Sequence, residues 1–391
     1  MAIDIIPGGV ATGESFFGRD QEINALWSEL NRSRNLLMVS PRRVGKTSLL
    51  HHLEDNPRGG WAVVYVDLQR VVDPVAAIEL ILDKLKKQGA VGQNIWSAFV
   101  SKLESIENIK IGLDGASLSL RQAASRRWDA TSSAFVDALL ASGAKGNRLV
   151  LIVDEFPILI KALVEDDKIR LAEDLLRLFR FARLDNGLLA NFRMIVCGSI
   201  GLKPVLRRHK MSADANDLKG FPLGPWSEKT ARAFMDAIAS AKPNLNFSSE
   251  IREAILRCTG TSPLPYHLQA VLSQLEDLGK DAAEVTVTDV GEARDLALRE
   301  AEFDHYFERL EAVFEPVELE LALLVLAHLS ITECSALGTI QALLPGSDKF
   351  KPVLRTLLED GYIISSQSDS GEKAYLFSNP MLKAYWALTH G

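Results

Sequence analysis

The residues best suited to chemistry lie together at positions 40–48, which read SPRRVGKTS. A glycine followed by lysine and threonine brings backbone N–H groups, a positive charge and a hydroxyl to one point. Such groups bind the phosphates of a nucleotide and the Mg²⁺ that accompanies them. The stretch departs from the usual pattern at Ser40, because a glycine normally stands five residues before Gly45. The alternative is a lysine-bearing loop between a strand and a helix that binds nothing.

Within this loop, Lys46 is expected to contact the β- and γ-phosphates, and the Thr47 hydroxyl is expected to ligate Mg²⁺. The backbone of a helix that begins here would add N–H donors and the positive end of its dipole. We expect the whole stretch to line the phosphate site: Ser40, Pro41, Arg42, Arg43, Val44, Gly45, Lys46, Thr47 and Ser48.

A pair of carboxylates, Asp154 and Glu155, follows an apolar run at residues 149–153. A strand that ends in such a pair supplies the second half of an NTP-hydrolysing site. Asp154 would hold the Mg²⁺ shell beside Thr47, and Glu155 would orient and polarise the attacking water. The pair is a weak signal alone and a strong one together with the Lys46 loop, because the two motifs are independent and complementary.

A third candidate is Ser199, which follows another apolar run at residues 192–197. A hydroxyl at that strand end could lie between the acidic strand and the loop, and there it could sense the γ-phosphate. The alternative is an ordinary turn residue. His267 has no evident use in such a site, and we expect it to be a packed or surface residue.

The elements that must position these residues alternate between strand and helix. Apolar residues at 36–39 and 61–68 are typical of buried parallel strands, and helical spacing follows at 46–53 and 74–88. This alternation predicts an α/β fold, a parallel sheet with helices on both faces. Residues 109–120 instead alternate with a period of two around Asp114-Gly115, which predicts a β-hairpin insertion.

Length and composition set further bounds. The 391 residues suit two or three domains, and 47% hydrophobic with 24% charged residues is ordinary for a globular protein. The net charge of −7 gives the chain no general attraction to nucleic acid. No apolar run approaches the roughly 20 residues that span a bilayer, and no signal peptide is indicated. The three cysteines are widely spaced and match no zinc pattern, which is consistent with a reducing cytosol. Together, these features lead us to expect a cytoplasmic protein without membrane contact.

The C-terminal part predicts a winged helix, because three helical stretches at 321–329, 336–344 and 350–358 precede two short strands. The third helix would offer Lys349, Lys351 and Arg355 to a DNA groove, but acidic residues oppose them. This composition favours an intramolecular or protein contact over DNA reading. A basic cluster at residues 203–210 is the other candidate for a nucleic-acid or acidic-partner contact.

Taken together, these motifs resemble the archaeal-type ATPase family within the AAA+/STAND group of P-loop NTPases. The resemblance is carried by FGRDQE at 17–22, PRRVGKTSLL at 41–50, VDEFP at 153–157, CGS at 197–199 and PYHLQ at 265–269, and it extends to FSNPMLKAYW at 377–386. It implies a nucleotide-binding domain at 1–222, a helical lid at 223–305 and a winged helix at 306–391.

The resemblance also implies that Gly18 and Arg19 border the adenine and ribose, and that Pro265 belongs to a lid motif near the nucleotide. On local grounds, residues 17–23 could equally be the capped start of a helix. The implied function is an ATP-driven molecular switch with Mg²⁺, slow hydrolysis and an output through domain rearrangement, through a protein partner or through self-association. The alternatives are a DNA-associated ATPase and an assembly module in which ATP or ADP is structural.

Overall fold

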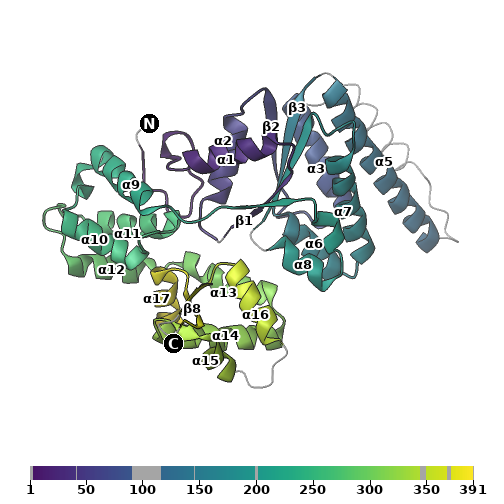
Figure 1. Ribbon diagram of the computed structural model, residues 1–391. Coiled ribbons are helices and arrows are strands. Elements are labelled where there is room, and N and C mark those ends of the chain that lie inside the picture. Colours follow the sequence, from purple (N-terminus) through teal and green to yellow (C-terminus); the bar gives the residue numbers. More distant parts are fainter. Residues whose placement is uncertain are drawn as a thin grey trace. The chain divides into compact units, whose positions relative to one another are not determined.

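A five-stranded parallel sheet forms the centre of the part of the chain that carries the acidic pair (Figure 1). Its strands follow the order β2-β3-β4-β1-β5, and every neighbouring pair runs parallel. One strand, β4, therefore lies between the acid-bearing strand β3 and β1, which leads into residues 40–48. The strands are β1 (Leu36–Val39), β2 (Trp61–Asp67), β3 (Arg148–Asp154), β4 (Phe192–Cys197) and β5 (Lys219–Pro222).

Helices cover both faces of this sheet, as the sequence predicts. In Figure 1, α1 and α2 lie on one side of the strands and α3, α5 and α7 on the other. The second face is filled by a single apolar core in which Val64, Leu151 and Phe179 are fully buried. The helices are α1 (Asp20–Asn31), α2 (Lys46–Asp55), α3 (Pro74–Lys87), α5 (Ala116–Ala144), α6 (Phe156–Glu165), α7 (Ile169–Leu184) and α8 (Leu202–Arg208), with the short turn η3 (Ser212–Ala215) after them.

The computed structural model describes residues 3–40, 42–89, 116–144, 146–198, 201–343, 349–367 and 371–390. Packing divides the chain into two units, and each has its own apolar core. The first unit contains Met1–Arg19, Ser40–Leu49 and Leu223–Gly391, and the second contains Asp20–Val39 and Leu50–Pro222. Within the described ranges, no helix combines the length and the apolar character needed to cross a membrane.

Helices dominate the first unit, and side-chain caps fix where several of them begin. Ser227 and Ser248 accept hydrogen bonds from the backbone of the first turns of α9 and α10, and Thr286 forms a capping box at α12. Phe234, Ile255 and Leu272 lie in the core that these helices share. The elements are η1 (Gly13–Ser15), α9 (Glu228–Ala241), η4 (Pro243–Leu245), α10 (Ser249–Thr259), α11 (Pro265–Asp277), α12 (Val287–Ala297) and α13 (Ala301–Val313).

The C-terminal elements combine helices with a small antiparallel sheet. The helices and strands that the sequence predicts between residues 321 and 377 are present, and a short strand, β6, precedes the second helix. The sheet has the order β6-β8-β7. The elements are α14 (Pro316–Ile331), β6 (Ser335–Ala336), α15 (Leu337–Ala342), α16 (Phe350–Glu359), β7 (Ile363–Gln367), β8 (Lys373–Phe377) and α17 (Pro380–Thr389).

The predicted β-hairpin at residues 109–120 is wrong in its second half. Residues 116–120 form the first turn of α5, which continues to Ala144. Residues 109–113 lie outside the described part of the chain. The helix prevails because the stretch contains no proline, has glycine only in its last turn and is rich in alanine and leucine. An alternation over five residues is too short to outweigh that preference.

Candidate nucleotide-binding site

The loop at residues 42–48 has left-handed backbone at two positions, a feature found in concave turns that bind anions. Arg43 and Gly45 both adopt left-handed conformations, with φ of 68° and 82°. Lys46 is the first residue of α2, and the Leu49 N–H closes the first helical turn on the Gly45 carbonyl at 3.0 Å. As a general rule, the first N–H groups of an α-helix lack an acceptor within the helix, and they commonly serve a bound anion.

A buried arginine holds this loop in place. Arg19 is 3% exposed, and its guanidinium donates to the Val44 carbonyl at 2.7 Å and to the Gly224 carbonyl at 2.9 Å. These bonds tie the loop to the chain segment that follows β5. They give Arg19 a structural role in shaping the loop, and its expected contact with adenine or ribose stays a prediction.

Neighbouring Gly18 explains why the N-terminal segment can approach α9 closely. Its φ is 71°, and a Cβ added there would lie 2.4 Å from Cγ2 of Thr230. The preceding Phe17 packs edge-on against Trp226 and Phe234, with ring centroids 6.1 and 5.5 Å away. Any residue other than glycine at position 18 would therefore force this contact apart.

Two further segments of the first unit contact the loop. The Tyr266 N–H, one residue after Pro265 at the start of α11, donates to the Arg43 carbonyl at 3.4 Å. The Arg43 guanidinium lies 5.0 Å from the centre of the Tyr266 ring, which is a cation–π distance. The N-terminal segment adds a bond from the Ala11 N–H to the Ser48 hydroxyl at 3.0 Å. Sequence reasoning missed Tyr266, although it stands inside the PYHLQ motif.

In the second unit, the acidic pair stands at the end of β3. Asp154 is 2% exposed, and its two carboxylate oxygens accept the Glu155 N–H at 2.9 Å and the Tyr65 hydroxyl at 3.1 Å. Burial, together with the negative charge of Asp154, raises the pKa of Tyr65 far above its usual value. The Tyr65 hydroxyl therefore stays protonated and fixes the plane of the carboxylate.

Glu155 occupies a strained position. It is not a glycine, yet its φ of 55° and ψ of 22° are left-handed, and it caps α6. Strain of this kind is concentrated at functional sites. Its carboxylate points toward the end of β4, because Oε2 lies 3.4 Å from the place that a Cβ on Gly198 would take. The same added Cβ would lie only 2.5 Å from Pro157 Cδ, so position 198 must be glycine for β4 to end here.

Tyr65 is itself supported by α2, which sequence reasoning did not foresee. The His51 ring lies 4.4 Å from the Tyr65 ring, and Glu54 accepts the Tyr65 backbone N–H at 3.0 Å. His51 follows Thr47 by four residues, so both side chains project from the same face of the helix. This four-residue spacing could have indicated from the sequence that His51 lies on the same side of α2 as Thr47.

The remaining predicted residues are placed only in part. Pro41 and Ser199 lie outside the described residues. Strand β4, which leads to Ser199, does lie between β3 and β1. Lys46 and Thr47 belong to the first unit, whereas Asp154 and Glu155 belong to the second.

The residues that are described suit a nucleotide with a divalent ion. A Cβ placed on Gly45 would meet no atom of the described residues within 4 Å, so their side chains leave this position open. The Thr47 hydroxyl and the Asp154 carboxylate are oxygen donors of the kind that Mg²⁺ prefers. Mg²⁺ commonly takes one or two protein ligands and fills its remaining positions with water and phosphate oxygens.

No family model matches this chain, and no curated protein matches it. Solved structures are similar over nearly its whole length, among them the following two. A Walker-type ATPase of Pyrococcus abyssi covers 98% of this chain and 98% of its own, with a TM-score of 0.63 and 18% identity. The ORC2 protein of Aeropyrum pernix, in complexes with ADPNP and ADP, covers 97% of this chain and 94% of its own, with a TM-score of 0.53 and 15% identity. These likenesses confirm the predicted α/β fold, in which helices cover both faces of a parallel sheet.

Proposed function

We propose that this chain is an ATP-binding molecular switch of the AAA+/STAND type that hydrolyses ATP slowly. The observation that carries the proposal is the strand order, in which β4 alone separates acid-bearing β3 from β1, the strand that leads into the lysine loop. Ligands of open α/β sheets bind beyond the carboxyl ends of the strands, where both motifs begin. The ORC2 protein of Aeropyrum pernix, which shares the fold, is solved in complexes with ADPNP and ADP, and this supports the proposal.

Each residue of the site has a distinct task in this proposal. The loop at 40–48 cradles the phosphates through its N–H groups, and Lys46 adds a point charge at the β- and γ-phosphates. Thr47 and Asp154 hold Mg²⁺, which would neutralise charge on the phosphates. Glu155 orients the attacking water and accepts its proton. Ser199 would sense the γ-phosphate, and Gly18, Arg19 and Pro265 would border the nucleoside.

The output is a rearrangement transmitted by the elements that contact the loop. We assign residues 223–305 to a lid and residues 306–391 to a winged helix, after a nucleotide-binding domain at 1–222. The contact between Tyr266 of α11 and Arg43 of the loop supports a lid role, because a change in the loop must alter it. A protein partner or self-association would then receive the signal.

Two substitutions test this function. Lys46→Ala should weaken ATP binding about 10- to 150-fold in calorimetry, since a charge-assisted phosphate contact contributes about 1.5–3 kcal/mol. Glu155→Gln should bind Mg·ATP like the parent chain and lose ATP turnover by about 100-fold or more. The exposed Lys87→Ala variant in α3 is the control for loss of a lysine charge. Equal ATP binding by the parent chain and Lys46→Ala would refute the proposal.

A further inference from the structure

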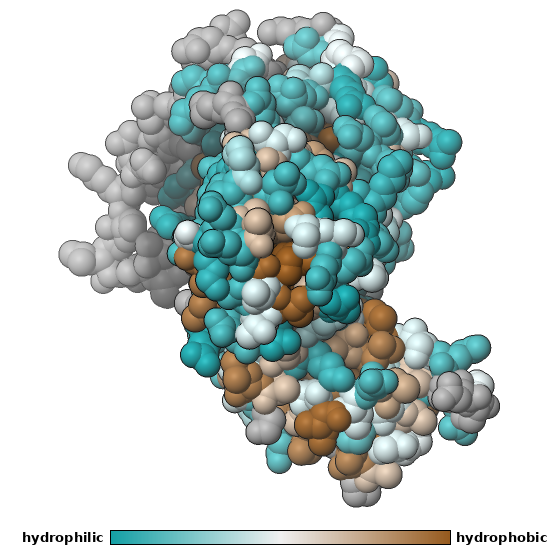
Figure 2. All heavy atoms as spheres, turned by 90° about the vertical axis from the view of Figure 1, so that its left-hand side faces the viewer, coloured by the Kyte–Doolittle hydropathy of each residue, from teal (hydrophilic) through white to brown (hydrophobic). Residues whose placement is uncertain are grey.

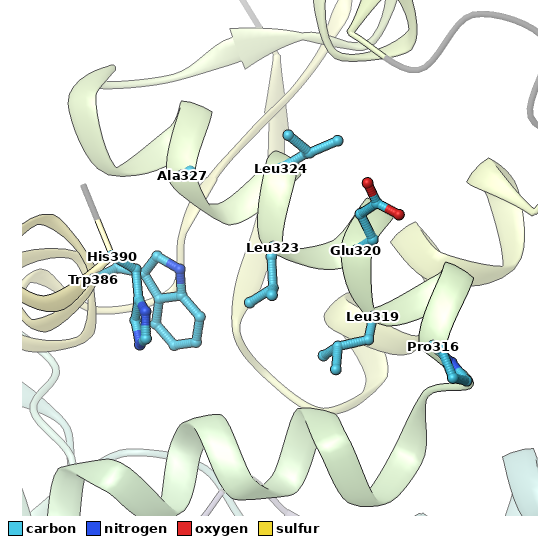
Figure 3. Close-up of a pocket in the computed structure, with 8 residues that line it drawn as sticks. All are labelled: Pro316, Leu319, Glu320, Leu323, Leu324, Ala327, Trp386 and His390. Carbon is cyan, nitrogen blue, oxygen red and sulfur yellow. The ribbon is translucent and has the colours of Figure 1, made fainter.

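An apolar groove runs along α14 beside the end of α17, and nothing in the proposed nucleotide site uses it (Figure 3). Its volume is about 470 Å³, and it is open to solvent on one side. Six of its eight lining residues come from α14. In Figure 3, Leu319 and Leu323 point to the side on which Trp386 and His390 lie, whereas Leu324 points to the adjacent side. The groove is therefore the uncovered face of one helix with an aromatic wall.

Helix α14 carries large apolar residues on every face, with Glu318 and Glu320 as its only acidic residues, and this is unusual for a helix at the surface. Its inner face is buried at Ala322, Val325, Leu326 and Leu329. Its outer face leaves three large apolar side chains 58%, 47% and 76% exposed: Val317, Leu324 and Ile331. They are spaced seven residues apart, which is about two helical turns, so they lie in one line along the helix. Figure 2 shows hydrophobic side chains on the surface of these C-terminal elements, at the lower end of the view.

Acidic side chains outnumber basic ones on α13 and α14, whereas α17 carries Lys383 and is followed by the groove-lining His390. Residues 305–333 contain six glutamates and one arginine. That arginine, Arg309, is committed to Asp360 at 2.7 Å, and both side chains are nearly inaccessible. Glu311, Glu315 and Glu320 are exposed near or within the groove-lining helix. An occupant must therefore cover an apolar stripe and also meet a negative rim.

A second copy of this chain is a poor candidate for the occupant of the groove, because its own glutamates would face those of the rim. If two copies of α14 paired antiparallel about Leu324, Glu315 of one copy would oppose Glu333 of the other. DNA is disfavoured for the same reason, since like charges repel. A cationic partner is favoured, because opposite charge steers association and fixes the register.

We propose that this groove binds an amphipathic helix of a protein partner, with apolar anchors three and four residues apart and lysine or arginine on its flanks. Helices commonly dock in this way, with one apolar face laid into a groove. Helix α14 has 16 residues, which at about 1.5 Å per residue corresponds to about 24 Å, or about four turns of a partner helix. Recognition here needs no nucleotide, so the proposal is independent of the ATP site.

The probe is a fluorescein-labelled peptide of about 18 residues, about five helical turns, with leucine at helical spacing and lysine elsewhere. A second peptide carries glutamate in place of each lysine. In fluorescence anisotropy at low salt, the full chain should bind the lysine peptide at least about 10-fold more tightly than the glutamate peptide. Leu324→Lys should weaken binding of the lysine peptide about 10-fold, and Glu320→Lys should weaken it at low salt more than at high salt.

A matched control is available in α7, because Leu184 is 47% exposed, as Leu324 is. Leu184→Lys should bind the lysine peptide like the parent chain. Because both leucines are partly exposed, circular dichroism should show that both variants are folded. Glu320→Lys changes an exposed residue and provides a second, independent test of peptide binding. Unchanged binding by Leu324→Lys would overturn the proposal, as would equal binding of the two peptides. If the parent chain were a dimer and Leu324→Lys a monomer, the proposal would also be overturned, because a second copy of the chain would then occupy the groove.

Discussion

At the scale of single residues, the buried carboxylate of Asp154, the proposed Mg²⁺ ligand, is held in a fixed orientation. Both of its oxygens take part in hydrogen bonds, one from the Glu155 backbone and one from the Tyr65 hydroxyl. Partners of this kind orient metal ligands and are often nearly as important as the ligands themselves. Tyr65 is therefore a positioning residue in the proposed site, one step removed from Mg²⁺.

Tyr65→Phe should weaken Mg²⁺ binding in the presence of ATP about 10-fold, because loss of such a partner lets the carboxylate rotate. Calorimetric titration of Mg²⁺ into the ATP-loaded Glu155→Gln variant measures this without turnover. ATP binding in the absence of Mg²⁺ should be unchanged. Tyr362→Phe is the matched control, since it also removes a buried tyrosine hydroxyl that donates to a backbone carbonyl, at 2.6 Å. The same loss of Mg²⁺ affinity in both variants would contradict the positioning role.

At the scale of elements, α11 forms a buried polar junction with α13 and α17. His267 is fully buried, and its ring nitrogens lie 3.0 Å from Oδ1 of Asn379 and 3.2 Å from the Tyr306 hydroxyl. Its ring also stacks on Phe303, with centroids 5.2 Å apart. Burial lowers the pKa of His267 to about 3, and the positive charge of Arg43 adds to this, against the opposing effect of the Asn379 bond. The folded chain thus holds His267 neutral.

This junction predicts a dependence of stability on pH. The unfolded histidine has a pKa of about 6.5, so below that pH the unfolded chain binds a proton that the folded chain excludes. The unfolding free energy should therefore fall as pH drops below 6.5, by up to about 1.4 kcal/mol per pH unit. Urea unfolding between pH 7.5 and 5 should show a shallower dependence in His267→Gln than in the parent chain. The control is His305→Gln, which changes a histidine whose side chain is 41% exposed. An equal dependence of the unfolding free energy on pH in the parent chain and in both variants would contradict this account.

The elements also show what sequence can and cannot predict here. The strands that flank the site were predictable, because β1 and β3 are continuous apolar runs that only a doubly covered sheet can bury. The prediction of a β-hairpin at 109–120 is wrong over residues 116–120, which begin α5, because a two-residue period over a few positions is outweighed by helix propensity. Tyr65 and Tyr266 were missed because their partners, Asp154 and Arg43, are distant in the chain. His267 was expected to be packed or exposed, and it is packed.

At the scale of the whole molecule, packing groups segments that are far apart in the chain. One apolar core runs from Trp226 to Trp386, and Ile3, Ile5 and Phe17 of the N-terminal segment pack against it. The loop at Ser40–Leu49 belongs to the same unit. The division into 1–222, 223–305 and 306–391 follows chain order and stays a prediction. The loop thus belongs to the unit that holds the C-terminal helices, as the proposed switch function would require.

Charge distribution at this scale bears on whether DNA is a partner. Residues 306–391 contain 11 acidic and 6 basic side chains. Helix α16 would enter a DNA groove. Its N-cap residue, Lys349, lies 3.8 Å from Glu318 Oε1, and the helix itself carries two cations, Lys351 and Arg355. A protein that neutralises several phosphates releases as many counterions, so its affinity falls steeply with salt. Too few cations face outward here for that behaviour.

We therefore predict that the chain does not bind duplex DNA measurably at about 50 mM salt, a condition under which phosphate contacts are strong. Anisotropy of a labelled duplex, with and without ATP, measures this, and a strongly basic DNA-binding protein serves as the positive control. Micromolar binding that weakens steeply with salt would contradict the prediction. If such binding were abolished by alanine at Lys349, Lys351 or Arg355, α16 would be the helix that contacts DNA. If alanines at residues 203–210 abolished it instead, the basic cluster near α8 would be the contact, and the acidic C-terminal part would stay free for the cationic helix proposed above.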